Sequence, residues 1–176
     1  MEHKGLLSGM KVLDLSRVLA APYCGMMLAD LGAEVIKVEA PAGDPLRYTA
    51  VNEGRPQDQK ENTSYDLENA GKTCVCLNTK TAAGREALEK LIAGADIFIT
   101  NWRQNPLKKA ALDYDTLHAK YPKLVYGFVS GYGEKGPDKD LPGFDFTAFF
   151  ARGGVLGTLF DKDSLPMLTI AGFGDH

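Results

Sequence analysis

Short apolar runs alternate along the chain with longer amphipathic stretches. Five of the runs have the length of buried strands, and they cover residues 11–15, 34–39, 73–78, 96–100 and 124–130. The stretches between and after them have the apolar spacing of helices, and they lie within residues 18–32, 80–93, 106–112, 114–121 and 144–152. This alternation predicts right-handed crossovers and therefore a doubly wound, mainly parallel α/β sheet, Rossmann-like in outline, that binds ligands at the carboxyl ends of its strands.

Two polar segments interrupt this pattern. Residues 41–72 are rich in Gly, Pro, Asn and Asp, which indicates a long loop of the functional or mobile kind. Residues 131–143 form a shorter loop before the last predicted helix.

The composition is that of an ordinary globular protein, with 44% apolar and 24% charged residues. A net charge of −3 gives no basic face for nucleic acid, and no apolar run reaches the ~20 residues of a membrane span. The N-terminus also lacks the apolar stretch of a secretion signal. The three cysteines, at 24, 74 and 76, are neither an even disulfide set nor a C-x-x-C metal pair. We therefore expect buried free thiols, no metal, and a reduced, cytoplasmic protein.

A parallel sheet with an acidic residue, Glu39, ending its second strand suggests a dinucleotide site. The turn after the first strand reads D-L-S-R-V-L-A-A-P-Y, however, and has no glycine where G-x-G-x-x-G brings the backbone close to a pyrophosphate. The G-Y-G-E-K-G run at 131–136 leads to Pro137 and not into a helix, which indicates a plain turn. The sequence argues against a nicotinamide or ATP enzyme.

Seven short motifs occur in one order along nearly the whole chain. They are G-M-K-V-L-D-L-S-R-V-L-A-A-P (9–22), L-G-A-E-V-I-K-V-E (31–39), A-G-D-P-L-R (42–47), A-D-I-F-I-T-N-W-R (95–103), S-G-Y-G-E-K-G-P (130–137), P-G-F-D (142–145) and G-F-G-D (172–175). Together they resemble the family III CoA-transferases. Two further stretches, E-N-T-S-Y-D-L-E-N-A-G-K and D-L-P-G-F-D-F-T-A-F-F-A-R-G-G-V, are similar to members that move CoA between 2-hydroxy acids, such as 2-hydroxyisocaproate or phenyllactate, and acyl or enoyl partners.

The resemblance implies that Asp175 is the nucleophile. A carboxylate that attacks an acyl-CoA thioester forms a mixed anhydride and then an aspartyl-CoA thioester, from which a free acid collects CoA without ATP. Gly172 and Gly174 would leave room for the substrate, and their N–H groups would face a developing oxyanion. From the residues alone, Asp175 also fits a solvated carboxylate in a flexible tail. His176 would adjust the pKa of Asp175 or be a bystander.

The resemblance also implies the residues that contact coenzyme A. They are Leu19, Ala20, Leu77, Asn78, Thr79, Lys80, Asn101, Trp102, Arg103 and Lys109. Lys80 begins a predicted helix, where free backbone donors accompany its charge. Trp102 would stack on adenine or belong to the core, and Arg103 would clamp a phosphate or be a surface charge.

Two positions depart from the family pattern. Family members often carry a basic residue where this chain has Ala40, and an arginine where it has Lys109. A lysine neutralises a phosphate but does not clamp it through two parallel hydrogen bonds. The nucleotide grip is therefore expected to be weaker or differently arranged.

Two other functions stay open. A related 2-methylacyl-CoA racemase would need a proton carrier where this chain has Phe144, in a motif that is typically G-H-D. The chain would otherwise be an inactive, truncated CoA-binding module.

Family members are considerably longer than this chain. We therefore expect residues 1–176 to be the N-terminal part of the CoA-binding α/β domain, without the small second domain and the C-terminal return. The resemblance implies an interlocked homodimer for the full-length protein, and we expect the 176-residue piece alone to be inactive.

Overall fold

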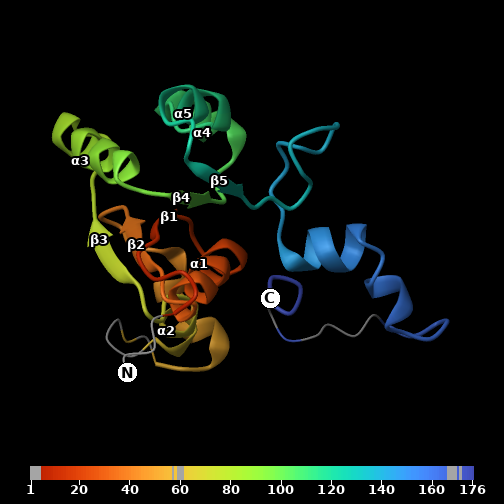
Figure 1. Cartoon of the computed structure of the whole chain (residues 1–176). Helices are drawn as coiled ribbons and strands as arrows, with labels where there is room; N and C mark the ends of the chain where they lie inside the picture. The colour runs from red at the N-terminus through yellow and green to blue at the C-terminus, as the bar shows by residue number, and fades with distance from the viewer. Residues whose placement is uncertain (1–4, 57, 59–61, 166–169, 171) are drawn as a thin grey trace.

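The computed structural model describes residues 5–56, 58, 62–165, 170 and 172–176. Its centre is a sheet of five parallel strands in the order β3-β2-β1-β4-β5 (Figure 1). The strands are β1 (Lys11–Leu15), β2 (Glu34–Glu39), β3 (Thr73–Cys76), β4 (Ile97–Thr100) and β5 (Val125–Phe128). The five predicted strands are confirmed, and three of them are shorter than the apolar runs that predicted them.

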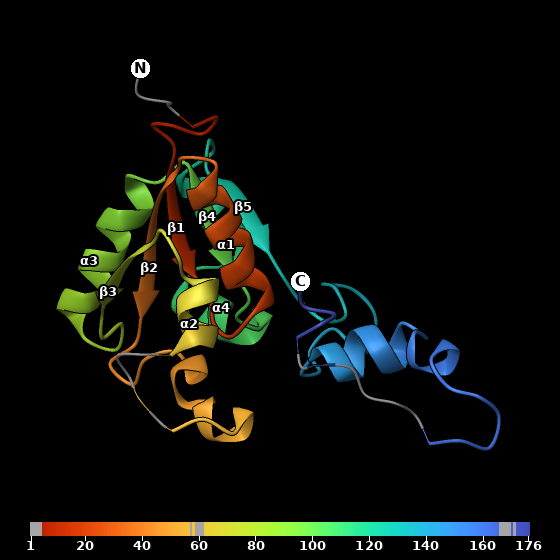
Figure 2. The same ribbon diagram turned by 90° about the horizontal axis from the view of Figure 1, so that it is seen from below.

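Helices cover both faces of this sheet (Figure 2). Helix α1 (Ala20–Asp30) packs on one face, and α3 (Ala82–Ala93), α4 (Gln104–Ala110) and α5 (Tyr114–Lys120) pack on the other. The winding is the doubly wound one that the strand–helix alternation predicted. None of the described helices is long and apolar enough to cross a membrane.

The core follows the period-2 alternation of the strands. Leu13, Leu15 and Phe98 are buried under α3, α4 and α5, whereas Val12 and Ile99 are buried under α1. Strands that are buried on both faces read as continuous apolar runs, which is why the sequence revealed them so clearly.

The long loop predicted for residues 41–72 is wrong in part, because the segment contains three short helices. They are the 3₁₀ helices η1 (Pro45–Tyr48) and η2 (Ala50–Glu53) and the α-helix α2 (Thr63–Glu68). Asp44 caps η1 by accepting from Leu46 N, and Asn62 caps α2 by accepting from Tyr65 N. The polar residues that suggested a loop are, at these two positions, helix caps.

The expectation of buried thiols is also wrong. Cys24, Cys74 and Cys76 are free and exposed. Cys74 and Cys76 do share one face of β3, but β3 is an edge strand of the sheet, and Val75 between them is the residue that packs toward the core.

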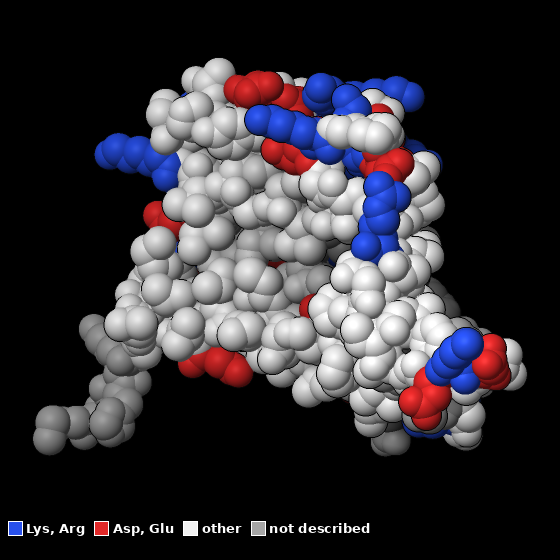
Figure 3. Space-filling view, turned by 90° about the vertical axis from the view of Figure 1, so that its right-hand side faces the viewer, with Lys and Arg blue, Asp and Glu red and all other residues white. Residues whose placement is uncertain are grey.

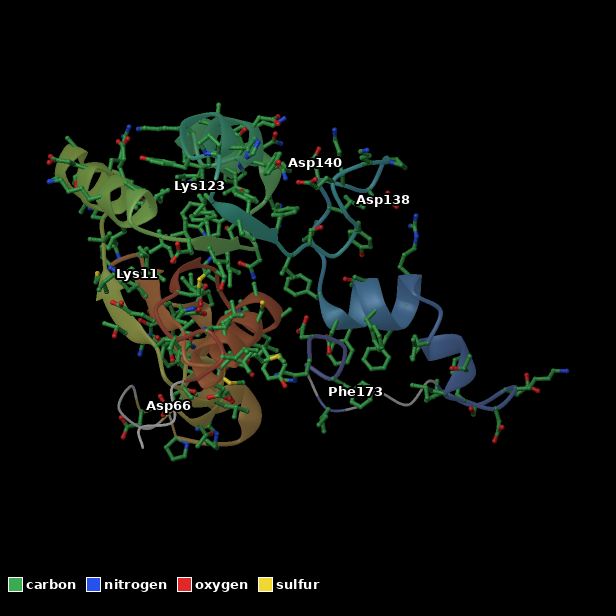
Figure 4. The ribbon with its side chains drawn as sticks, in the orientation of Figure 1. Lys11, Asp66, Lys123, Asp138, Asp140 and Phe173 are labelled. Carbon is green, nitrogen blue, oxygen red and sulfur yellow. The ribbon has the colours of Figure 1, made fainter. Side chains whose placement is uncertain are left out.

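The chain after β5 leaves the sheet as an arm (Figure 1). The arm consists of the loop 131–143, the π-helix η3 (Asp145–Arg152), the 3₁₀ helix η4 (Leu156–Thr158) and the C-terminal turn. Gly131 and Gly143 close the base of the loop so tightly that a Cβ on either would come within 2.5 Å of the other's Cα. Asp138 on this loop forms an ion pair with Arg152 of η3, and Phe173 lies at the opposite side of the arm (Figure 4).

Candidate functional site

A buried ion pair fixes the segment that follows β2. Lys37 Nζ lies 3.0 Å from Asp44 Oδ2, and both side chains are 0% exposed. Glu39 lies two residues after Lys37 and Arg47 three residues after Asp44, and Arg47 donates two hydrogen bonds of 2.9 Å to the Glu39 carboxylate. Burial raises the pKa of Glu39, but hydrogen bonds from Arg47 and Tyr65 outweigh it, and the pKa lies below the ordinary value. The I-K-V-E and A-G-D-P-L-R motifs thus neutralise one another's charges.

The same carboxylate of Asp44 shapes the turn after β1. Val18 has φ +68°, a left-handed conformation that is unusual for a β-branched residue, and its N–H donates to Asp44 at 3.1 and 3.3 Å. Asn101 holds Arg17 from the other side, accepting from its N at 3.0 Å and donating to its O at 2.6 Å. A strained turn held from two sides is typical of a binding site.

A second buried ion pair lies under the start of α1. Lys72 Nζ is 2.7 Å from Asp14 Oδ2, and both side chains are 0% exposed. Lys72 also donates to Pro22 O at 2.6 Å and to Asn69 Oδ1 at 3.0 Å. Burial lowers the pKa of Lys72, and Asp14 opposes that shift. All three hydrogens of this ammonium group therefore have partners inside the protein.

A cavity of about 370 Å³ opens between these turns, at the carboxyl ends of β1 and β2. Its walls come from four turns and hold Leu15, Ser16, Arg17, Val38, Glu39, Ala40, Ala42, Gly43, Asp44, Pro45, Tyr48, Leu77, Thr79 and Trp102. The structure thus brings together three of the predicted CoA contacts, Leu77, Thr79 and Trp102. The Trp102 ring lies 5.7 Å from the Arg17 guanidinium, and its Nε1 is buried without a partner among the described residues.

The other predicted contacts do not line this cavity. Asn78 and Lys80 belong to the same turn after β3, and Asn101 and Arg103 flank Trp102 after β4. Leu19 and Ala20 lie at the start of α1, and Lys109 lies in the last turn of α4. Sequence reasoning missed the roles of Asp44 and Arg17, although A-G-D-P-L-R was singled out as a motif.

The C-terminal turn is wedged between α1 and η3. Gly172, at φ +83°, accepts from Asp175 N at 3.0 Å and lies so close to Leu19 that a Cβ would meet its Cδ1 at 2.8 Å. Gly172 N donates to Asp145 Oδ2 at 2.8 Å. The expectation that this N–H faces an oxyanion is therefore wrong in this structure, because the buried Asp145 already accepts from it. Ala171, before the turn, lies outside the described residues.

Asp175 is half-buried among other acids. Burial raises its pKa, the charge of Asp145 raises it further, and His176 lowers it. His176 Nε2 lies 2.7 Å from Oε1 of the buried Glu68, and its ring meets Tyr23 edge-on at 4.8 Å. His176 is thus tied to α1 and α2, which places the turn of Asp175 next to Leu19.

Gly174 fills a position that has no room for a side chain. A Cβ there would lie 2.5 Å from Phe149 Cδ1 and 2.6 Å from its Cγ. We expect Gly174→Ala to destabilise the whole protein by about 1–3 kcal/mol in urea unfolding, because either the ring or the turn must move. Gly157→Ala is the matched control, since no atom lies within 4 Å of its added Cβ. Equal stability of the two variants would contradict the wedged geometry.

Within the described part of the chain, no three His, Cys, Asp or Glu side chains are grouped so as to hold a metal ion. Near Asp175, Asp145 accepts from Gly172 N, and Oε1 of Glu68 lies against His176 Nε2.

Residues 7–176 match CoA-transferase family III. The chain is 60% identical over 171 residues to the cinnamoyl-CoA:phenyllactate CoA-transferase of Clostridium sporogenes, covering 97% of this chain and 42% of that protein. It is 49% identical over 171 residues to the (R)-2-hydroxy-4-methylpentanoate CoA-transferase of Clostridioides difficile, covering 97% of this chain and 43% of that protein. The chain therefore spans less than half the length of these relatives.

A solved structure has the same fold. The CAIB/BAIF family protein of Brucella suis is 35% identical, with a TM-score of 0.87 over 98% of this chain and 46% of that one.

Proposed function

The chain belongs to CoA-transferase family III, and we propose that the whole protein moves CoA from an acyl-CoA to a free 2-hydroxy acid of the phenyllactate or 2-hydroxyisocaproate type. The observation that carries the proposal is the wedged turn of Asp175, held beside Leu19 where β1 passes into α1. The two relatives named for phenyllactate and 2-hydroxy-4-methylpentanoate support the substrate class.

In the proposed reaction, Asp175 attacks the thioester carbonyl. A C–O bond forms, the C–S bond breaks, and CoA leaves as a thiolate. The thiolate attacks the aspartyl carbonyl of the mixed anhydride and releases the first acid. The carboxylate of the 2-hydroxy acid then displaces CoA from the aspartyl thioester, and the thiolate collects the new acyl group and frees Asp175. No proton is gained or lost overall, and one thioester replaces another.

The cavity at the carboxyl ends of β1 and β2 is the proposed place of the CoA nucleotide. Trp102 lines it with one face near the Arg17 guanidinium, which suits an aromatic base and a phosphate side by side. Lys80 follows at the turn into α3, where its charge suits a phosphate. The remaining predicted contacts, from Leu19 to Lys109, stay proposals of the same kind.

The arm exposes apolar residues that a partner of the whole protein would cover. Its exposed apolar residues are Leu141, Phe144, Phe149, Leu159, Phe160, Leu165, Ile170 and Phe173. Figure 3 views the molecule from the side on which the arm lies. The middle of this face is largely uncharged, and charged side chains lie along its margins. Such a surface suits a protein partner, and we propose that a second copy in an interlocked homodimer covers it. The three free thiols suit a reducing compartment such as the cytoplasm.

The racemase alternative is not favoured. Phe144 is 61% exposed and has no titratable group, so the proton carrier of a racemase is missing from this position. The two relatives compared above are named as CoA-transferases.

An isotope experiment separates the two reactions. We expect the whole protein, given a saturated acyl-CoA and phenyllactate in deuterated water, to form phenyllactyl-CoA without deuterium at the carbon next to either carbonyl. Mass spectrometry of both thioesters measures this. Rapid deuterium uptake in the absence of an acceptor acid would contradict the proposal and indicate proton transfer at that carbon.

A further inference from the structure

Glu68 carries a buried carboxylate oxygen that no described residue satisfies. It is the last residue of α2, its residue surface is 1% exposed, and its Oε1 lies 2.7 Å from His176 Nε2. Because a carboxylate only accepts, the imidazole Nε2 carries the hydrogen of this bond. The second oxygen, Oε2, is buried without a hydrogen-bond partner among the described residues. Burying such an oxygen without a donor is unfavourable, because it loses the hydrogen bonds that water would give it.

Two polar donors near α2, Lys72 and Tyr65, are committed elsewhere. Lys72 gives its three hydrogens to Asp14, Pro22 and Asn69. The Tyr65 hydroxyl donates to Oε1 of Glu39. A donor for Glu68 Oε2 must therefore come from outside these groups, and a bound ligand would supply one.

Glu68 also lies beside the proposed nucleophile. His176, which its Oε1 binds, directly follows Asp175, and Gly172 O accepts from the N of both residues. The charge of Glu68 contributes to the raised pKa of Asp175. In the acceptor 2-hydroxy acid, the hydroxyl is carried by the carbon next to the carboxylate that would attack the aspartyl thioester of Asp175. A group that binds this hydroxyl must therefore lie within a few ångströms of Asp175.

We propose that Glu68 is the residue that selects 2-hydroxy acids, by accepting a hydrogen bond from the substrate 2-hydroxyl at Oε2. The inference rests on the proposed function and names the side chain that sets its substrate class. A hydroxyl donor satisfies the buried oxygen, whereas a substrate with a second hydrogen in place of this hydroxyl leaves it unpaired. Sites built to bind a substrate hydroxyl reject the analogue without it far more strongly than apolar pockets distinguish single methylene groups.

The test compares two acceptor acids in the whole protein, with one acyl-CoA donor. The acids are 3-phenyllactate and 3-phenylpropionate, which differ only in the 2-hydroxyl. We expect wild type to prefer phenyllactate. We expect Glu68→Met to lower the ratio of kcat/KM for phenyllactate to kcat/KM for phenylpropionate at least ~10-fold, mainly because kcat/KM for phenyllactate falls. Glu68→Gln keeps the shape and removes the charge, and we expect an intermediate ratio; it also serves if the Met variant does not fold.

His176→Ala is the control for a role in positioning alone. It removes the Glu68–His176 bond but leaves the Glu68 carboxylate, and we expect it to lower the rates with both acids by a similar factor. If the Glu68 variants also lower both rates equally, Glu68 only anchors the turn and the inference is overturned. If wild type moves CoA to neither acid, the proposed function fails first, and the inference fails with it.

Discussion

Asp175→Asn is expected to lower CoA transfer by the whole protein at least ~10³-fold, as for other enzymes that lose a covalent nucleophile. The amide has the size of the carboxylate but no negative charge, so it does not attack a thioester. The turn around it keeps its hydrogen bond from Asp175 N to Gly172 O and its wedge against Leu19, because neither uses the Asp175 side chain. The loss therefore appears in kcat and not in folding, and steady-state kinetics with circular dichroism measures both.

A trapping experiment tests the same residue by a different route. Wild type incubated with acyl-CoA and then with hydroxylamine is expected to carry a hydroxamate on Asp175, because both proposed intermediates are activated aspartyl carbonyls. Peptide mass spectrometry locates the modification. Asp161→Asn, an exposed carboxylate on the same arm, is the matched control and should leave transfer and labelling unchanged. Near-normal turnover of the Asp175 variant would remove this residue from the mechanism.

Lys37→Met is expected to destabilise the protein by about 3–5 kcal/mol. The methionine fills a similar volume, but Asp44 remains as a buried charge without its 3.0 Å partner. Asp44 also accepts from Val18 N and caps η1, so the loss extends to the turn that borders the 370 Å³ cavity. Urea unfolding of the two proteins measures the difference.

The exposed pair between Lys90 and Glu86 provides the comparison. Its atoms are also in contact, at 2.7 Å, but the side chains are 75% and 69% exposed. Water screens such a pair, and we expect Lys90→Met to change stability by less than about 0.5 kcal/mol. A similar small effect of Lys37→Met would mean that the buried pair does not hold the loop to the sheet.

The strands and most helices could be predicted because their signals are local. Residues that are neighbours in the chain set the period of the apolar pattern, and the order of strands and helices restricts the connections to a parallel sheet. The G-F-G-D motif likewise predicted Asp175 as the nucleophile, because a family resemblance compares residues in chain order. The residues that line the cavity come from separate turns, and no local pattern in the sequence predicted that they meet.

The amino-acid sequence by itself therefore determined the five strands, the covering helices, the family and the candidate nucleophile. Tertiary structure decided which charges meet. Lys37 binds Asp44 across the turn after β2, and Lys72 binds Asp14 from a distant segment, and no period in the sequence encodes those pairs. It also decided burial: alternation placed Cys74 and Cys76 on one face, but the edge position of β3 exposed them. Glu68 is an acidic residue at the end of a helix, a position that is usually solvated, yet other segments bury it. Burial depends on what other segments cover, and only the folded chain supplies that cover.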